Sequence, residues 1–259
     1  GRAPQWGYAE SVLIDGQWLV CTPGGRQATI VALQKANGQP VWTSPVGDDA
    51  QYSSILKVSI GRVPQYVNFT KRGVIAVRAK DGKPLWRWNR PANGTANVTT
   101  PVWYGQTIFA ASAYGTGGGL VWPRVTADGF QPQELYFTRD MKNHHGGLVL
   151  FDGCLYGAND PDHLVCLDYK TGREKWSDPR PGKCSLLFAD NMLFCRDENG
   201  PVSLVEATPK EFRLRGRFEQ PDRSRRKAWP HPVIAGGLLF LRDQDVLLCY
   251  DVRADGPDR

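Results

Sequence analysis

The chain has 259 residues, of which 41% are hydrophobic and 22% are charged, a composition typical of a soluble globular protein. Its net charge is +6, and its apolar runs fall short of the ~18 residues that a membrane span requires, so no transmembrane segment is expected. The densest basic run, RSRRK at residues 223–227, contains no aromatic residue, which favours a solvated loop and no nucleic-acid partner.

Pairs of apolar runs joined by short turns follow one another along the chain. They occur at residues 11–21 (SVLIDGQWLVC), 100–112 (TPVWYGQTIFAAS), 147–157 (GLVLFDGCLYG), 185–195 (SLLFADNMLFC) and 232–242 (PVIAGGLLFLR). Gly, Asp or Asn stands at each turn, and no helical 3.6-residue periodicity competes with this pattern. Each pair therefore predicts an antiparallel hairpin.

A second phrase recurs as ALQKANGQPVW (32–42), AVRAKDGKPLW (76–86) and CLDYKTGREKW (166–176). Degenerate copies occur at residues 120–129, 204–212 and 249–256, and the second of them has phenylalanine in the place of tryptophan. Asn-Gly, Asp-Gly and Thr-Gly supply the positive φ that tight turns need, so each phrase predicts a strand, a turn and a strand.

A period of about 45 residues with four strands per unit predicts an all-β fold, namely a β-propeller of four-stranded antiparallel blades. Six units are visible in one propeller domain over residues 1–259, at roughly 7–46, 50–92, 96–139, 143–180, 182–220 and 228–256. The aromatic residue that ends the phrase is expected to dock the outer strand of one blade onto its neighbour. These docking residues are Trp42, Trp86, Trp176 and Phe212.

The phrase resembles the pyrroloquinoline-quinone (PQQ) repeat in its tryptophan-docking form, AxDxxTGxxxW, over nearly the whole chain. The runs WGYAES (6–11), NGTANVTTPV (93–102), NHHGG (143–147), WPHPV (229–233) and LRDQD (241–245) are similar to those of exported PQQ-like propellers from planctomycete-type bacteria. This resemblance implies a periplasmic or otherwise exported protein with an eight-bladed ring. We therefore expect about two N-terminal blades and a signal peptide to be missing from this sequence; the alternative is a six-bladed ring closed by residues 1–6.

The innermost strands of propeller blades line a central channel, and the residues that begin these strands lie at one mouth of it. Aligning the units places NHHGG and the equivalent polar stretches of the other units at this mouth. The candidate ligand-binding residues are Tyr8, Glu10, Tyr52, Thr100, His144, Lys183 and Trp229. Because adjacent residues of an extended chain point in opposite directions, only one histidine of the pair is expected to face the channel.

Three interpretations of this mouth are open. A divalent transition metal would find suitable ligands in Glu10, His145 and His231. Alternatively, histidine and glutamate act as acid and base on a carbohydrate or alcohol, with Lys183 neutralising developing charge and aromatic rings stacking on a sugar. In the third interpretation these residues only hydrogen-bond loop backbone and channel water.

PQQ-dependent alcohol dehydrogenases, which share the repeat, usually place a vicinal cysteine pair over the cofactor, and this chain has no such pair. PQQ is therefore not the expected cofactor. Outer-membrane assembly lipoproteins share the repeat and bind proteins without a cofactor. We expect a scaffold whose partner is a small molecule, a carbohydrate or a cell-envelope protein. The alternative is a metal- or quinone-dependent oxidoreductase, or another carbohydrate- or alcohol-active enzyme, using the same mouth.

None of the six cysteines forms a CxxC pair, which argues against a zinc ribbon. Most lie inside apolar runs, so buried free thiols in strands are expected. The alternative is a link between neighbouring strands, either Cys154 with Cys166 or Cys184 with Cys195.

Overall fold

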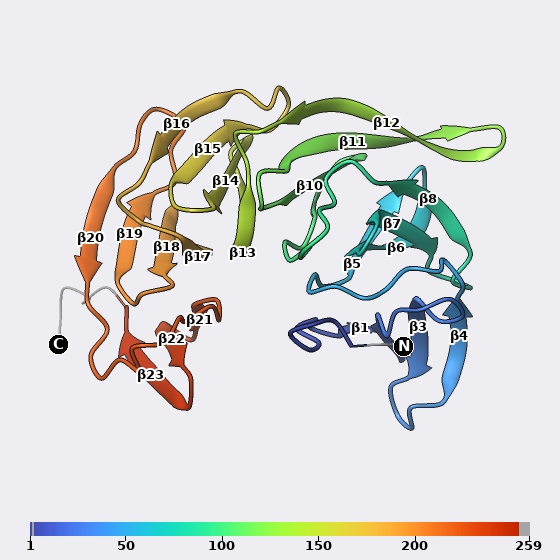
Figure 1. Ribbon diagram of the computed structural model, residues 1–259, viewed down its shortest axis with the longest axis horizontal. Coiled ribbons are helices and arrows are strands. Elements are labelled where there is room, and N and C mark those ends of the chain that lie inside the picture. The colour runs from blue at the N-terminus through green and yellow to red at the C-terminus, as the bar shows by residue number, and fades with distance from the viewer. Residues whose placement is uncertain (2, 254–259) are drawn as a thin grey trace. The chain divides into compact units, whose positions relative to one another are not determined.

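The structure, a computed structural model, describes residue 1 and residues 3–253, and this part of the chain forms β-strands and no helix. Five sheets have four antiparallel strands and a sixth has three, and strands that are consecutive in the chain are neighbours in each sheet (Figure 1). This is the architecture of a propeller of four-stranded blades. Because no helix occurs in the described residues, none is available there to cross a membrane.

The described residues group into two compact units. Unit 1 comprises residues 1–144 and 170–172, and unit 2 comprises residues 145–169 and those from 173 onward. The first three sheets contain β1 (Leu13–Asp15), β2 (Trp18–Cys21), β3 (Ile30–Gln34), β4 (Pro40–Ser44), β5 (Leu56–Ile60), β6 (Val63–Thr70), β7 (Gly73–Arg78), β8 (Pro84–Trp88), β9 (Val102–Tyr104), β10 (Thr107–Ser112), β11 (Gly117–Thr126) and β12 (Gly129–Thr138).

The last three sheets contain β13 (Asn143–Phe151), β14 (Cys154–Asn159), β15 (Leu164–Asp168), β16 (Glu174–Asp178), β17 (Cys184–Ala189), β18 (Met192–Asp197), β19 (Val202–Glu206), β20 (Leu214–Phe218), β21 (Val233–Ala235), β22 (Leu238–Asp243) and β23 (Val246–Asp251). Each sheet falls within one of the six predicted repeat units. The end of the sixth unit, residues 254–256, lies outside the described residues.

The repeated phrase forms the outer hairpin of a sheet, and its tryptophan has the same register each time. Ala32, Ala76 and Cys166 pair with Trp42, Trp86 and Trp176, and the register shifts by one residue directly beside each of these pairs. Such a shift is a β-bulge, which bends the strand that carries it. A short local pattern therefore sets both the turn and the position of the indole.

Two docking contacts use a glycine of the following repeat. The Trp42 ring stacks on Tyr66, with ring centroids 5.9 Å apart, and covers Gly82, where a Cβ atom would overlap the indole. Tyr136 of β12 covers Gly172 in the same way. The third unit, which has no tryptophan at the expected position, therefore docks through a tyrosine.

The other predicted docking residues have different partners. Trp86 is buried with Ile108 and Val121 of the third sheet, although its Nε1 donates to Gln65 of its own sheet. Trp176 is also buried, and its Nε1 donates to the carbonyl oxygen of Thr208 at 2.8 Å.

Phe212 contacts the preceding sheet, because its ring lies edge-on to Trp176 at 5.7 Å between centroids. In its own sheet the position opposite Leu204, which tryptophan would occupy, is held by Gly216. The contact with the following sheet comes instead from Phe218, whose ring lies 5.2 Å from that of Tyr250.

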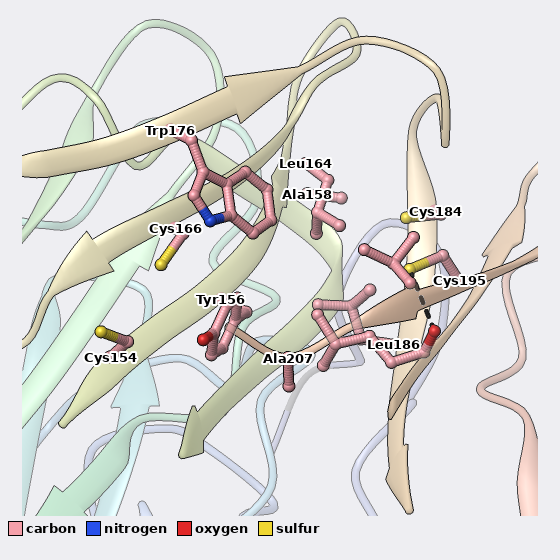
Figure 2. Packing of buried hydrophobic residues seen from close by; sticks show 12 residues of the cluster. Cys154, Tyr156, Ala158, Leu164, Cys166, Trp176, Cys184, Leu186, Cys195 and Ala207 are labelled. Atoms are coloured by element: carbon pink, nitrogen blue, oxygen red, sulfur yellow. Dashed lines mark hydrogen bonds between the residues drawn. The ribbon is translucent and has the colours of Figure 1, made fainter. Parts of the chain in front are cut away.

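The largest core of unit 2 contains four cysteines. Cys154, Cys166, Cys184 and Cys195 are buried and free, and Figure 2 shows them beside Tyr156, Trp176 and Leu186. Burial strongly raises the pKa of Cys166, so this thiol stays protonated at neutral pH. Cys21 and Cys249 are also free thiols. The structure thus has the expected free thiols rather than a link between neighbouring strands.

Candidate functional site

The two histidines of NHHGG have different partners in different units. His144 belongs to unit 1, where its Nε2 lies 3.1 Å from the hydroxyl of Tyr114. His145 belongs to unit 2 and is buried, with Nδ1 3.3 Å from Ser185 Oγ. This separation follows from the extended strand, in which adjacent side chains point to opposite faces.

The glycine pair of NHHGG allows close packing of the start of β13. A Cβ atom on Gly146 would overlap the carbonyl oxygen of Cys184 in β17. A Cβ atom on Gly147 would lie 2.6 Å from Cε1 of His231, and Gly147 has φ of +70°. The His231 imidazole lies against this backbone, and its Nε2 donates to the carbonyl oxygen of His145 at 3.0 Å.

The hydrogen bonds of Ser185 determine which atom donates between Ser185 and His145. Ser185 Oγ donates its only proton to the carbonyl oxygen of Trp229 at 3.0 Å, so it accepts from His145 Nδ1. His145 Nδ1 therefore carries a proton, and Nε2 lies 3.5 Å from Glu198 Oε2.

Glu198 connects the elements of the site. Its carboxylate accepts hydrogen bonds from Lys227 Nζ at 2.7 Å and from Trp229 Nε1 at 2.9 Å. Its backbone carbonyl accepts from the Ala228 N–H at 2.8 Å. We call His145, Ser185, Glu198, Lys227 and Trp229 the Glu198 cluster.

Glu198 is ionised at neutral pH. Burial acts to raise the pKa of its carboxyl, but the hydrogen bonds from Lys227 and Trp229 and the charge of Lys183 outweigh burial and lower this pKa. Lys183 itself forms an ion pair with Asp160 at 2.7 Å. A carboxylate held in this way is a poor proton donor near pH 7.

Trp229 is the exposed aromatic member of the Glu198 cluster. Its side chain is 50% exposed, while one side of the indole lies against the imidazole of His145 with centroids 5.8 Å apart. The N–H group is bonded to Glu198, so the orientation of the ring is fixed. An aromatic surface held in one orientation loses little conformational entropy when a partner packs on it.

The combination of serine, histidine and glutamate does not form a hydrolase triad. Ser185 is fully buried, and its proton is donated to a backbone carbonyl, so its oxygen is not presented to a substrate. Among the described residues, no group of three or more His, Cys, Asp or Glu side chains is arranged to hold a metal ion.

The remaining predicted site residues lie in unit 1. The Glu10 carboxylate accepts from the backbone N–H and the hydroxyl of Thr22, at 2.7 and 2.9 Å. Tyr8 is exposed and donates its hydroxyl proton to the Pro23 carbonyl, whereas Tyr52 is buried beneath Trp6. These three residues thus have local partners in unit 1, while His145 and His231 belong to unit 2.

Thr100 takes part in a series of bonds between successive repeats of unit 1. Ser11 N donates to Ser54 Oγ, and Ser54 N donates to Thr100 Oγ1, both at 3.0 Å. The residues that were aligned at the starts of the innermost strands therefore contact one another within this unit.

Glu198 was not among the residues predicted from the sequence. It lies in the polar turn DENG between β18 and β19, a composition typical of a solvated turn. The available signal was its place in the repeat, directly after an innermost hairpin.

Comparisons with known proteins agree with this architecture. The sequence matches the family described as outer membrane protein assembly factor BamB, over residues 2–129 and 111–211. No curated protein matched the sequence significantly.

Solved structures of low sequence identity share the fold. BamB from Moraxella catarrhalis has a TM-score of 0.68 and 14% identity, with 92% of this chain and 67% of that chain covered. Quinohemoprotein alcohol dehydrogenase from Comamonas testosteroni has a TM-score of 0.66 and 12% identity, with 94% and 52% covered. Sqt1 from Saccharomyces cerevisiae also has a TM-score of 0.66 and 12% identity, with 92% and 69% covered.

These likenesses show a fold that is shared by proteins with different functions. The family match is independent of them and extends over most of the chain. The protein therefore belongs to the PQQ-repeat propeller family described as outer membrane protein assembly factor BamB.

Proposed function

We propose that this protein is an extracytoplasmic scaffold that binds a cell-envelope protein through the surface around Trp229. The observation that carries the proposal is the state of the Glu198 cluster. Its carboxylate, its serine hydroxyl and the neighbouring His231 imidazole are all bonded within the protein, while the Trp229 ring is half exposed. A rigid indole surrounded by satisfied polar groups is typical of an interaction hot spot.

The family supports a protein partner, because its description names outer membrane protein assembly. A carbohydrate or other small ring-shaped ligand that stacks on Trp229 is the alternative within the same proposal. Both partners use the exposed indole face, and neither requires a group in the cluster to transfer a proton.

Site-specific photocrosslinking in the cells of origin tests the proposal. A photoreactive amino acid replaces Trp229 in the full-length protein, and the control replaces Lys210, which is exposed in the same unit. We expect a discrete envelope protein to be crosslinked from position 229 and not from position 210. Equal crosslinking from the two positions, or none from 229, would refute the proposal. Protection of Trp229 fluorescence from quenching by a soluble glycan would identify the small-ligand alternative.

A metal-dependent oxidoreductase is the second candidate, and the approach of His145 Nε2 to Glu198 at 3.5 Å favours it. The test is elemental analysis of protein purified without chelator or histidine tag. About one transition metal per chain, lost in His145→Ala, would make the enzyme the better proposal; absence of metal from the wild type would exclude this candidate.

The Glu198 cluster does not fit PQQ itself. Its one carboxylate is bonded to Lys227 and Trp229, whereas calcium, which accompanies this cofactor, takes six to eight oxygen ligands.

A further inference from the structure

The loop of residues 222–231 is held in place from both ends. At its start, the fully buried Asp243 carboxylate accepts from Ser224 Oγ at 2.6 Å and from Ser224 N at 3.1 Å, with Arg223 Nε at 3.6 Å. At its other end, Glu198 bonds Lys227 and Trp229. These contacts hold the backbone on both sides of Arg225 and Arg226.

The loop presents positive charge that the residues described by the structure do not neutralise. It contains four basic residues and one acidic residue, Asp222. Arg223 and Lys227 are paired with Asp243 and Glu198, which leaves two arginines. Arg225 and Arg226 are exposed and form no ion pair within the described residues.

The backbone conformation of the loop is consistent with the exposure of Arg225 and Arg226. Arg225 has φ of +61°, in the left-handed region that residues other than glycine seldom adopt. Arg226 N donates to Ser224 Oγ at 3.1 Å, and its carbonyl accepts from Arg223 at 2.9 Å. Both bonds use the backbone of residue 226, so its guanidinium group is not engaged by them.

We propose that this loop docks an acidic polypeptide segment, whose carboxylates pair with Arg225 and Arg226 while an apolar side chain packs on Trp229. The inference rests on the proposed scaffold function and specifies the chemistry of its partner. Planar guanidinium groups bind carboxylates through two parallel hydrogen bonds, and arginine and tryptophan are enriched in protein-interaction hot spots.

The arrangement favours a polypeptide over the other polyanions. Nucleic acid binding without sequence preference uses several aromatic rings for successive bases, and this loop contains one indole. An anionic membrane surface is attracted by any basic cluster, but it makes little use of an indole whose N–H is fixed to Glu198.

The test uses the full chain and a labelled peptide in which Asp and Glu flank one Phe, with an Asn and Gln counterpart of the same length. The test variant is Arg225→Gln with Arg226→Gln. The matched control is Arg26→Gln with Arg139→Gln, which removes the same charge from exposed positions of unit 1. Anisotropy titrations measure Kd at low and high salt.

We expect the acidic peptide to bind the wild type and the control variant equally, and the test variant at least about tenfold more weakly, as the loss of a charge-assisted pair requires. High salt should weaken binding to the wild type. The inference is overturned if the two double variants behave alike, if the amide peptide binds as well, or if only phosphatidylglycerol vesicles bind through these arginines. Crosslinking from position 229 without peptide binding would refute this inference and leave the scaffold function intact.

Discussion

Replacement of Gly147 by alanine would test whether NHHGG is built to pack against His231. The added Cβ atom would lie 2.6 Å from His231 Cε1, so the imidazole must move and lose its bond to the His145 carbonyl. Alanine in the left-handed region costs about 1–2 kcal/mol, and loss of the hydrogen bond adds about 1 kcal/mol. The total of about 2–3 kcal/mol corresponds to a fall in Tm of ~4–12 °C for a chain of this length.

Gly153 provides the matched control. It has φ of +72°, close to the +70° of Gly147, and a Cβ atom there meets nothing within 4 Å. Gly153→Ala should therefore cost only the backbone strain of about 1–2 kcal/mol.

The Tm of Gly147→Ala and of Gly153→Ala is measured by differential scanning calorimetry, each in the original background and in the His231→Ala background. If the reasoning is right, Gly147→Ala costs more than Gly153→Ala, and the excess disappears once the imidazole is removed. Equal costs in the original background, or an excess that persists without His231, would refute the packing account.

Two further predictions concern unit 2. Trp176→Ala should lower the free energy of unfolding by about 3–5 kcal/mol, because it empties a buried indole site. Trp103→Ala, at a 42% exposed position, should lower this free energy much less. Similar losses for the two variants in urea unfolding would contradict the docking role. The folded-state pKa of Glu198 is lowered from 4.5, so its stabilisation is complete above that value and is lost as pH falls through the folded pKa. Glu198→Gln should thus have a lower Tm than the wild type at pH 7, and this difference in Tm should become smaller as the pH falls. The control Glu174→Gln, at an exposed position, should have the same Tm as the wild type across this pH range.

The sheets could be predicted because their signals are local in the sequence. Glycine four residues before tryptophan specifies a turn and a pairing partner within eleven residues, as the pairs of Ala32 with Trp42 and Ala76 with Trp86 show. Each hairpin also carries its own turn residues. The family assignment followed from the same repeated phrase and agrees with the family match.

The docking aromatic residues were predictable only where the hairpin has the standard length. In the third sheet β11 and β12 have ten residues each, so Tyr136, well beyond the expected position, reaches Gly172. In the fifth sheet, spacing predicted Phe212, but the register places Gly216 at the equivalent pair. An insertion changes the register of a strand pair, and this change cannot be recognised from a single sequence.

Residues of the site form hydrogen bonds with residues about one repeat away in the sequence. In unit 1, Ser11 bonds Ser54, 43 residues on, and Ser54 bonds Thr100, 46 residues on. In unit 2, His145 bonds Ser185, and Ser185 bonds the Trp229 carbonyl 44 residues on. These bonds join starts of successive innermost strands, although the donors and acceptors differ.

The side chains at these positions therefore distinguish the two units. At the two ends of the series unit 1 has Ser11 and Thr100, whereas unit 2 has His145 and Trp229. The turn between β18 and β19 adds the Glu198 carboxylate, which contacts both of these unit 2 residues. The Ser54 and Thr100 hydroxyls accept from backbone N–H groups, whereas an oriented indole offers apolar surface to a partner. The repeat spacing therefore predicted which segments contact one another within each unit. It did not predict Glu198, because this residue lies in a polar turn whose composition is typical of a solvated loop.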